Sequence, residues 1–202
     1  VLYGIRGSKP QAVLMAHKWI QGQSGVERCE RFAIHRTNQL SDDHVLGFSR
    51  STVLTKSIET KGAHSSLQVL SEGKNLTLVA FKEGGDVNSL LRKLIPGDRI
   101  DWLGMKAPDG SIHLERLSIN SSLPRITGRP ICCNGKTMRS AGSNQPLRCL
   151  NCERVVEKHW LYEEINLNGI ELVSGWAEPS PSQRRHLSKP LSLGIPLSLE
   201  NI

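Results

Sequence analysis

Four cysteines between residues 132 and 152 constrain this chain more than any other feature of its sequence. They form two pairs, Cys132 with Cys133 and Cys149 with Cys152. The second pair has two residues between its cysteines, a spacing that lets two thiolates reach one tetrahedral Zn²⁺ ion. The residues between the pairs include glycine and proline and are numerous enough for a short hairpin. The pattern therefore predicts a small zinc ribbon in which all four cysteines hold a structural Zn²⁺.

The first pair is irregular because its two cysteines are adjacent. Neighbouring side chains diverge in an extended chain, so both thiols can bind one ion only if the backbone turns sharply. Gly135 favours such a turn. Two ligand sets therefore stay open, all four cysteines or three of them with a substitute such as His159. The alternative to a metal is a disulfide or a pair of buried thiols. We find nothing like a signal peptide or a membrane span, so we expect a reducing cytoplasm, which disfavours disulfides.

The composition favours several small units and an anionic partner. Only 4% of the 202 residues are aromatic and 38% are hydrophobic, so one large core is less expected than small units, one of them held by metal. The net charge is +7, which favours nucleic acid as a partner. Residues 123–160 carry seven basic and two acidic residues, whereas residues 51–120 carry nine and eight. The excess of basic residues therefore lies in the cysteine module, where these residues either bind a polyanion or form a solvated face.

Residues 1–49 read as a mixed α/β segment. We predict a strand over residues 1–5, a helix over 10–21 with proline in its first turn, and a second strand over 31–35. A dense polar cluster follows at residues 37–44. Its composition is typical of a loop that satisfies its own backbone. The functional alternative is a loop facing a substrate, in which Asn38 and Gln39 form hydrogen bonds and Asp43 pairs with a cation.

Residues 50–120 predict a small β-barrel. The expected order is three strands, a helix and two strands, with strands over 52–58, 65–70, 76–81, 99–105 and 112–119 and a short helix capped by Asp86. This is the order of an OB-fold, a five-stranded barrel that binds oligonucleotides on one face. Trp102 and Phe81 are the aromatic residues available for base stacking, or they belong to the core. Lys56 is a candidate phosphate contact.

The C-terminal third divides into the ribbon and a basic tail. Residues 121–165 contain the ribbon, with a closing strand expected over 155–165. Residues 166–202 form the tail, with a short strand over 170–176. A compact basic group flanked by prolines then either contacts RNA or is solvated; its members are Arg184, Arg185, His186 and Lys189. The predicted fold class is α+β and multi-domain, with domains at 1–49, 50–120, 121–165 and 166–202.

Several motifs together resemble one enzyme family. They are the ribbon segment 136–142, the opening segment 3–7 with residues 37–39 and 43–44, and the tail segment 184–191. The chain resembles the C-terminal half of the archaeal tRNA(Ile) 2-agmatinylcytidine synthetase family, which modifies the wobble cytidine of the isoleucine tRNA that reads AUA. The resemblance implies the end of a ferredoxin-like domain, an OB-fold and a zinc ribbon. The chain departs from the family pattern at the adjacent Cys132 and Cys133, where the family has C-x-x-C. This departure puts the zinc affinity of the site in question.

The resemblance also implies partners and roles. ATP and Mg²⁺ would be bound only by a catalytic domain absent from this chain, so we expect no catalytic residue here and no activity from the chain alone. The expected partners are tRNA, agmatine and the missing N-terminal catalytic half, without a membrane. The implied agmatine loop consists of Asn38, Gln39, Asp43 and His44. The expected RNA-binding residues are Lys56, Trp102, Arg129, Lys136, Arg139, Arg148, Arg184, Arg185, His186 and Lys189.

Two other functions remain open. The first is a non-enzymatic single-stranded nucleic-acid-binding protein built from the same barrel and ribbon. The second is a protein-interaction ribbon with incidental charge. The few aromatic residues of the barrel argue against the first, because such binders stack bases on aromatic rings. Neither function has a role for the loop at 37–44 or for the basic tail.

Overall fold

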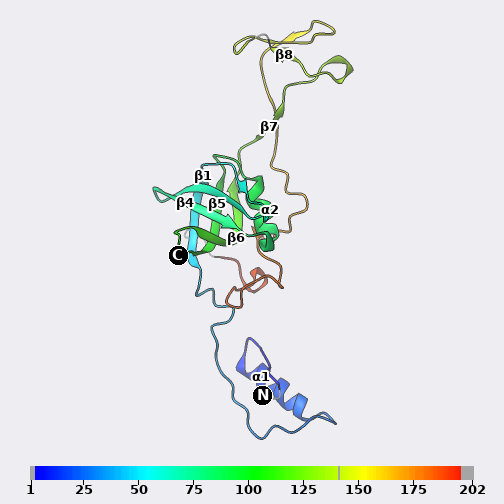
Figure 1. The fold of residues 1–202 in the computed structure, drawn as a ribbon. Helices are drawn as coiled ribbons and strands as arrows, with labels where there is room; N and C mark the ends of the chain where they lie inside the picture. The colour runs from blue at the N-terminus through cyan, green and yellow to red at the C-terminus, as the bar shows by residue number, and fades with distance from the viewer. Residues whose placement is uncertain (1–2, 141, 197–202) are drawn as a thin grey trace. The chain divides into compact units, whose positions relative to one another are not determined.

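The computed structural model of the chain describes residues 3–140 and 142–196 (Figure 1). The fold is α+β, rich in sheet and poor in helix. It divides into two compact units, one ending at Asn38 and one beginning at Gln39. No helix of the described residues is long and apolar enough to cross a membrane.

The first unit contains the predicted helix, α1 (Pro10–Gln21), with proline at its start as expected. The rest of the described unit is irregular, so the predicted strands are not formed at residues 3–5 and 31–35; residues 1–2 lie outside the described part. A strand requires a neighbour to satisfy its backbone groups, and the described residues of this unit provide none. Side chains order the unit instead: Tyr3 Oη lies 2.8 Å from His17 Nδ1, and the His17 and Phe32 rings are 4.1 Å apart.

The second unit is built on a curved sheet. Its first six strands are β1 (Leu46–Val53), β2 (Ile58–Glu59), β3 (Ser65–Ser71), β4 (Lys74–Ala80), β5 (Arg99–Lys106) and β6 (Ile112–Ser121). They pair in the order β1-β5-β6-β4-β3-β2, and β1 also pairs with β3, which closes the sheet into a barrel. All of these pairings are antiparallel except β4 with β6. The predicted element order is confirmed, although the strand expected at 52–58 is divided between β1 and β2.

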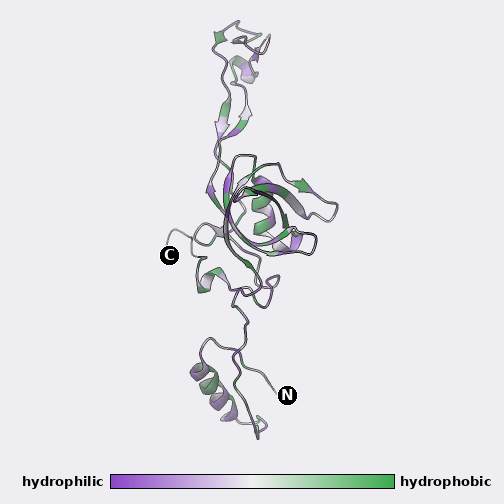
Figure 2. Cartoon of the chain, turned by 90° about the vertical axis from the view of Figure 1, so that its left-hand side faces the viewer, coloured by the Kyte–Doolittle hydropathy of each residue, from purple (hydrophilic) through white to green (hydrophobic). Residues whose placement is uncertain are grey.

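The barrel core follows from the alternation of apolar residues along the strands. In β3, every second side chain is buried. Helix α2 (Asp86–Lys93), preceded by the 3₁₀ turn η1 (Lys82–Gly84), adds Val87, Leu90 and Leu91 to this core. Figure 2 shows the apolar residues of α2 and of the curved sheet together. Gly85, at φ 52°, precedes the helix, so the predicted capping residue Asp86 is instead the first helical residue.

The cysteine module contains two small sheets. Strands β7 (Arg125–Gly128) and β11 (Leu161–Glu163) pair with each other, and β8 (Arg139–Ser140), β9 (Leu147–Arg148) and β10 (Val155–Val156) form the second sheet. The 3₁₀ turn η2 (Cys133–Gly135) precedes β8. The single closing strand predicted for residues 155–165 is wrong, because β10 pairs beside the cysteines whereas β11 returns to β7.

The tail folds back onto the barrel. Leu167, Ile170 and Leu172 pack against the barrel core, and β12 (Trp176–Ala177) pairs with β6. Of the strand predicted at 170–176, only this short element and a bridge from Val173 are present. The 3₁₀ turn η3 (Leu191–Leu193) buries Leu191. The described part of the tail is therefore folded onto the barrel, although Arg185 and His186 of its basic group remain exposed.

Candidate functional site

The adjacent cysteines turn sharply at the residues that follow them. Asn134 and Gly135 both adopt left-handed backbone angles, with φ of 58° and 66°. The backbone N–H of Cys132 donates to the carbonyl of Lys136 at 2.9 Å, which closes the turn. Glycine accepts this conformation without cost, and asparagine tolerates it better than most residues. The turn expected near Gly135 is therefore present.

The second pair forms a compact knuckle. The backbone N–H of Glu153 donates to the carbonyl of Cys149 at 3.0 Å, and the N–H of Asn151 approaches Cys149 Sγ at 3.4 Å. The Asn151 side chain also donates to Cys133 Sγ, at 3.1 Å. Hydrogen bonds of this kind orient sulfur ligands and stabilise their negative charge.

The four thiols converge on one point. Cys132 Sγ lies 3.5 Å from Cys152 Sγ, and Cys133 Sγ lies 3.6 Å from Cys149 Sγ. All four sulfur atoms lie within 4.8 Å of one another. Four thiolates about 2.3 Å from one ion would be about 3.8 Å apart in a tetrahedron, so the four sulfurs fit a metal ion. His159 is not part of this group; its Nδ1 lies 2.9 Å from the carbonyl of Glu157.

The thiols differ in acidity. Backbone N–H groups of Cys152 and Asn151 lower the pKa of Cys149 to about 6. For Cys132, a backbone bond from Cys133 lowers the pKa, but the thiol of Cys152 and burial outweigh it and raise the pKa to about 11. Cys149 is therefore more readily ionised than an ordinary cysteine, and metal binding, which requires thiolates, would release protons from the cluster.

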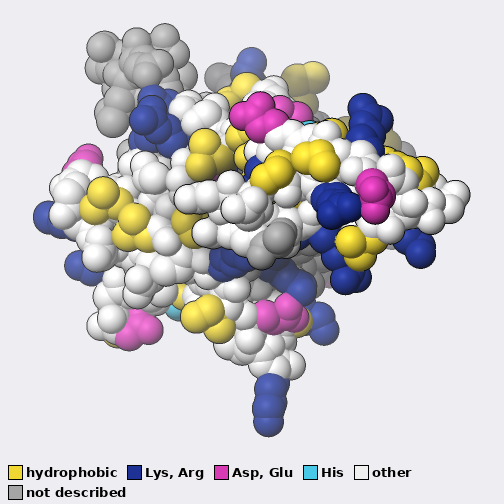
Figure 3. All heavy atoms as spheres, turned by 90° about the horizontal axis from the view of Figure 1, so that it is seen from above, with side chains coloured by type: hydrophobic (Ala, Val, Ile, Leu, Met, Phe, Trp, Pro, Cys, Tyr) yellow, Lys and Arg dark blue, Asp and Glu magenta, His cyan; other side chains and the backbone are white. Residues whose placement is uncertain are grey.

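Exposed cations surround the cysteine module. Lys136, Arg139 and Arg148 are exposed, and Arg139 lies directly opposite Arg148 across β8 and β9. Arg148 also pairs with Glu153 at 3.0 Å. Arg129 lies over the ring of Trp160, 5.3 Å from its centroid. Figure 3, which views the molecule from above, shows Lys and Arg side chains scattered among hydrophobic ones over the visible surface of the molecule.

The two RNA-binding residues predicted in the barrel, Lys56 and Trp102, differ in their exposure. Lys56 is exposed between β1 and β2. Trp102 is only 1% exposed, and its indole N–H donates to Ser51 Oγ at 2.8 Å. The prediction that Trp102 binds RNA is therefore wrong, because a buried ring cannot stack on a base. Its place two residues after Ile100, on the same face of the strand, was the signal for a core role.

Arg116 of β6 joins the polar loop to the basic tail. It is buried and donates two hydrogen bonds of 2.8 Å to the carboxylate of Asp42, and it also donates to the carbonyl of Lys189. The backbone N–H of Lys189 donates to the same carboxylate at 2.7 Å. Burial raises the pKa of Asp42, but the bonds from Arg116 and Lys189 outweigh burial, so the pKa is lowered.

Glu115, the preceding residue of β6, makes a second junction. Its buried carboxylate lies 2.7 Å from His44 Nε2 and 2.9 Å from Arg185 Nε, and Ser188 Oγ donates to its other oxygen. Backbone bonds from Leu40 to His186 and from Asp42 to Leu187 complete the contact. Sequence reasoning missed Glu115 and Arg116, although two adjacent charges inside a predicted strand imply that one of them faces inward.

These contacts change the predicted roles of several residues. His44 is turned inward onto Glu115, so the prediction that it faces a substrate is wrong. Arg184 is half-buried and pairs with Glu178 at 3.3 Å, which gives it a structural role in the tail. Other predicted residues remain exposed and accessible to a ligand: Asn38, Gln39, Asp43 and His186.

Comparisons with known proteins agree on one family. A family model described as TiaS FLD domain matches residues 1–44. The tRNA 2-agmatinylcytidine synthetase TiaS of Methanosarcina mazei is 34% identical over 95% of this chain and 46% of its own length. The crystal structure of apo TiaS matches with a TM-score of 0.67 and 28% identity, over 94% of this chain and 47% of that one.

A crystal structure of TiaS in complex with its isoleucine tRNA, AMPCPP and agmatine matches with a TM-score of 0.66 and 25% identity, over 94% of this chain and 45% of that one. The chain thus spans about half the length of the curated relatives it matches. The resemblance inferred from the sequence is confirmed. Over nearly its whole length, in sequence and in fold, the chain belongs to the TiaS family and corresponds to its C-terminal half.

Proposed function

We propose that this chain is the tRNA-binding half of an ATP-dependent ligase that attaches agmatine to the wobble cytidine of AUA-decoding isoleucine tRNA. One observation carries the proposal: the chain matches, over 94% of its length, a solved structure that holds an isoleucine tRNA, an ATP analogue and agmatine. ATP and Mg²⁺ would be bound by the half of the enzyme outside this chain. The chain alone binds tRNA and does not catalyse the reaction.

The barrel is an OB-fold in this proposal. Its closed order, the parallel pairing of β4 with β6, and a helix between β4 and β5 support that assignment. The other domains would be a ferredoxin-like segment at the start, the ribbon at 121–165 and the tail. Because β1 begins at Leu46, we place the first boundary between Asn38 and Leu46. The tail from residue 166 packs on the barrel and would act with it.

The metal of the ribbon is a structural Zn²⁺ in this proposal. Four thiolates in a tetrahedral arrangement are the donor set that Zn²⁺ favours in structural sites. The small core of the module, Met138, Leu147 and Cys149, is too limited to order it alone. The metal would thereby fix the positions of the basic side chains around it.

The ribbon would contact the phosphate backbone of the tRNA. Like charges directly opposite on paired strands destabilise a sheet. Arg139 lies directly opposite Arg148, so this pair lowers the stability of the small sheet, but together the two guanidinium groups can bind a phosphate. Lys136 and Arg129 extend the same basic surface. On the barrel and tail, Lys56 and His186 are exposed contacts of the same kind, and Arg185 is a further exposed RNA contact.

The exposed loop residues would contribute to the agmatine site. Agmatine carries two positive charges, and Asp43 is an exposed carboxylate, whereas Asp42 is already paired with Arg116. Asn38 and Gln39 offer amide groups close to it in the sequence. As a tRNA-modifying enzyme, the complete protein would act in the cytoplasm.

The test is the affinity of the metal-loaded chain for folded isoleucine tRNA and for single-stranded DNA of equal length, each at several salt concentrations. We expect tighter binding to the tRNA, with a steep loss of affinity as salt rises, because phosphate contacts release counterions. Equal affinity for both nucleic acids would instead indicate a generic single-strand binder. A shallow salt dependence would indicate a protein-interaction ribbon.

A further inference from the structure

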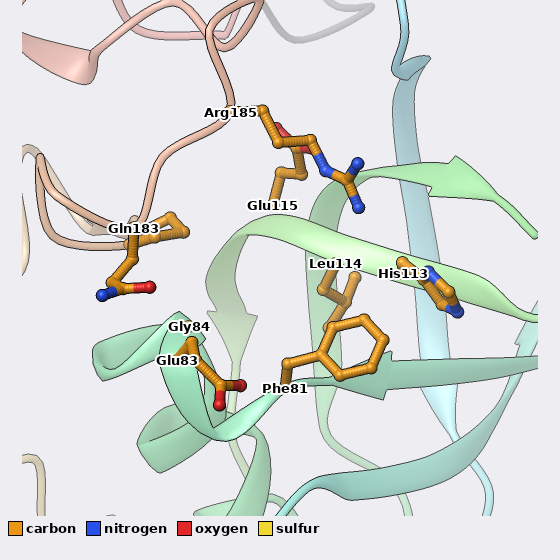
Figure 4. A pocket seen from close by; sticks show the side chains of 9 residues that line it. Phe81, Glu83, Gly84, His113, Leu114, Glu115, Gln183 and Arg185 are labelled. Carbon is orange, nitrogen blue, oxygen red and sulfur yellow. The ribbon is translucent and has the colours of Figure 1, made fainter.

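A small cavity lies between the barrel and the folded tail (Figure 4). Its volume is about 260 Å³. The barrel side contributes Phe81, Glu83, His113 and Glu115, and the tail contributes Gln183 and Arg185. Sites for drug-sized ligands measure roughly 300–1,000 Å³, so this cavity suits one flat ring rather than a long molecule.

Aromatic rings form one wall of the cavity. Phe81 follows β4 directly, and its ring meets that of His113 edge to face, with centroids 4.7 Å apart. His64 packs against Phe81 as well, at 5.3 Å and a similar angle. Figure 4 shows the Phe81 ring among the residues that line the cavity. The two histidines hold the ring in place, which prepares it as a stacking surface.

Polar groups of the tail form the opposite side. Gln183 is exposed and offers an amide with both donors and acceptors. Arg185 Nε is held at 2.9 Å by Glu115, whose side chain is only 8% exposed. The turn that carries Gln183 is itself fixed, because Arg184 pairs with Glu178 and Glu178 accepts from the backbone of Leu191. The turn that carries Gln183 is therefore ordered by contacts outside the cavity, and Arg185 is ordered by its pair with Glu115 in the cavity wall.

The charges of the cavity select the ligand. Glu115 is already paired with Arg185 and His44, and Glu83 is a single exposed carboxylate, 3.8 Å from His64 Nδ1. The lining thus holds two carboxylates and one guanidinium, which gives no positive excess to favour a phosphate, and Glu83 is the one lining carboxylate left for a cation, too few for a dication. A flat aromatic wall facing an amide and a guanidinium is the environment in which proteins hold unstacked RNA bases.

We propose that this cavity holds a single unpaired base of the bound tRNA, stacked on Phe81 and hydrogen-bonded by Gln183 and Arg185. The inference rests on the proposed tRNA binding and adds a site that reads a base. Because the tail forms one side of the cavity, the site exists only when the tail is docked on β6, so this docking would be required for base binding.

The test compares three variants of the metal-loaded chain by their affinity for isoleucine tRNA across a range of salt concentrations. Phe81→Leu removes the stacking ring but keeps an apolar side chain, and Gln183→Ala removes the amide from an exposed position where folding is not affected. Asn168→Ala, an exposed amide in another turn, is the matched control. We expect Phe81→Leu to bind about 10-fold more weakly, Gln183→Ala to bind measurably more weakly, and the control to bind as the natural chain does.

The salt dependence identifies the contact. Loss of a base contact leaves the slope of log affinity against log salt unchanged, whereas loss of a phosphate contact lowers it by about one. Suppose that the natural chain binds tRNA and that Gln183→Ala and Phe81→Leu either bind it equally well or lower the salt slope. The proposed base site would then be rejected, whereas the proposed tRNA binding would be kept. Failure of the natural chain to bind tRNA would overturn both. Binding of agmatine that Glu83→Gln abolishes would show that the cavity is an amine site instead.

Discussion

Asp98 is a fully buried carboxylate that connects the barrel to the ribbon. It accepts hydrogen bonds from the backbone N–H groups of Ile95 and Leu123 and from the guanidinium of Arg125, at 2.6 to 2.9 Å. Burial raises its pKa, but these bonds and the charge of Arg125 outweigh burial, so the pKa is lowered. One side chain thus joins the turn after α2, the linker and the start of β7.

The Asp98→Asn substitution should destabilise the second unit by about 3 kcal/mol at neutral pH, because it leaves a largely buried arginine unpaired. A lowered folded-state pKa means that the stabilisation is present above the ordinary value of 3.8 and is lost as the pH falls through the folded value. Urea unfolding at several pH values should therefore show that the difference in free energy of unfolding between the natural chain and the variant shrinks in acid. Asp109→Asn, at an exposed turn, is the control; a similar loss there would contradict the assignment.

The Cys133→Ser substitution separates the possible ligand sets of the ribbon. We expect the natural chain to hold one zinc ion, Cys133→Ser to hold it much more weakly, and His159→Ala to hold it as the natural chain does, because only the four sulfurs converge among the described residues of the ribbon. Zinc bound after dialysis against a weak chelator is the measurement. Retention by Cys133→Ser together with loss in His159→Ala would mean that the ligand set is wrong.

At the scale of elements, the docking of the tail on β6 depends on Arg116. The Arg116→Gln substitution leaves Asp42 without its bidentate partner and releases the carbonyl of Lys189. We expect the tail to detach more often and trypsin to cleave after Arg184 and Arg185 several-fold faster than in the natural chain. Arg92→Gln, which removes an exposed pair with Glu59, should leave cleavage unchanged. Equal cleavage in all three chains would show that the tail is held by its apolar contacts alone.

The elements that the sequence predicted well are those with sustained periodicity. Helix α1, helix α2 and the strands β3 to β6 each present an apolar face long enough to recognise. The two-residue strands of the ribbon and tail have no such pattern. The junction of Asp42 with Arg116 and Lys189 joins residues far apart in the chain, and nothing local in the sequence indicates it.

The candidate metal site was predictable because its chemistry is local. The C-x-x-C spacing identifies two ligands, and Gly135 indicates the turn that the adjacent pair needs. The roles of Trp102 and His44 were not predictable in this way. Whether an aromatic ring or a histidine faces a ligand or the interior depends on which face of a strand or loop is covered, and the covering segments here come from elsewhere in the chain.

For the whole molecule, the proposed role of Asp43 in binding agmatine can be tested only in a complete enzyme. The Asp43→Ala substitution should raise the KM for agmatine several-fold with little change in kcat, because an exposed carboxylate that pairs with a bound cation contributes to binding in both ground and transition states. Asp109→Ala is the matched control. An unchanged KM in steady-state kinetics would remove Asp43 from the site.

We propose that a metal-ordered ribbon gives this chain its recognition of tRNA, and we would test this first by measuring tRNA affinity before and after metal removal. We would compare isoleucine tRNA with single-stranded DNA of equal length at fixed salt, on the zinc-loaded chain and on the same chain stripped by chelator. We expect the preference for tRNA to be strong with zinc and largely lost without it. A preference that survives complete removal of the metal would contradict the claim.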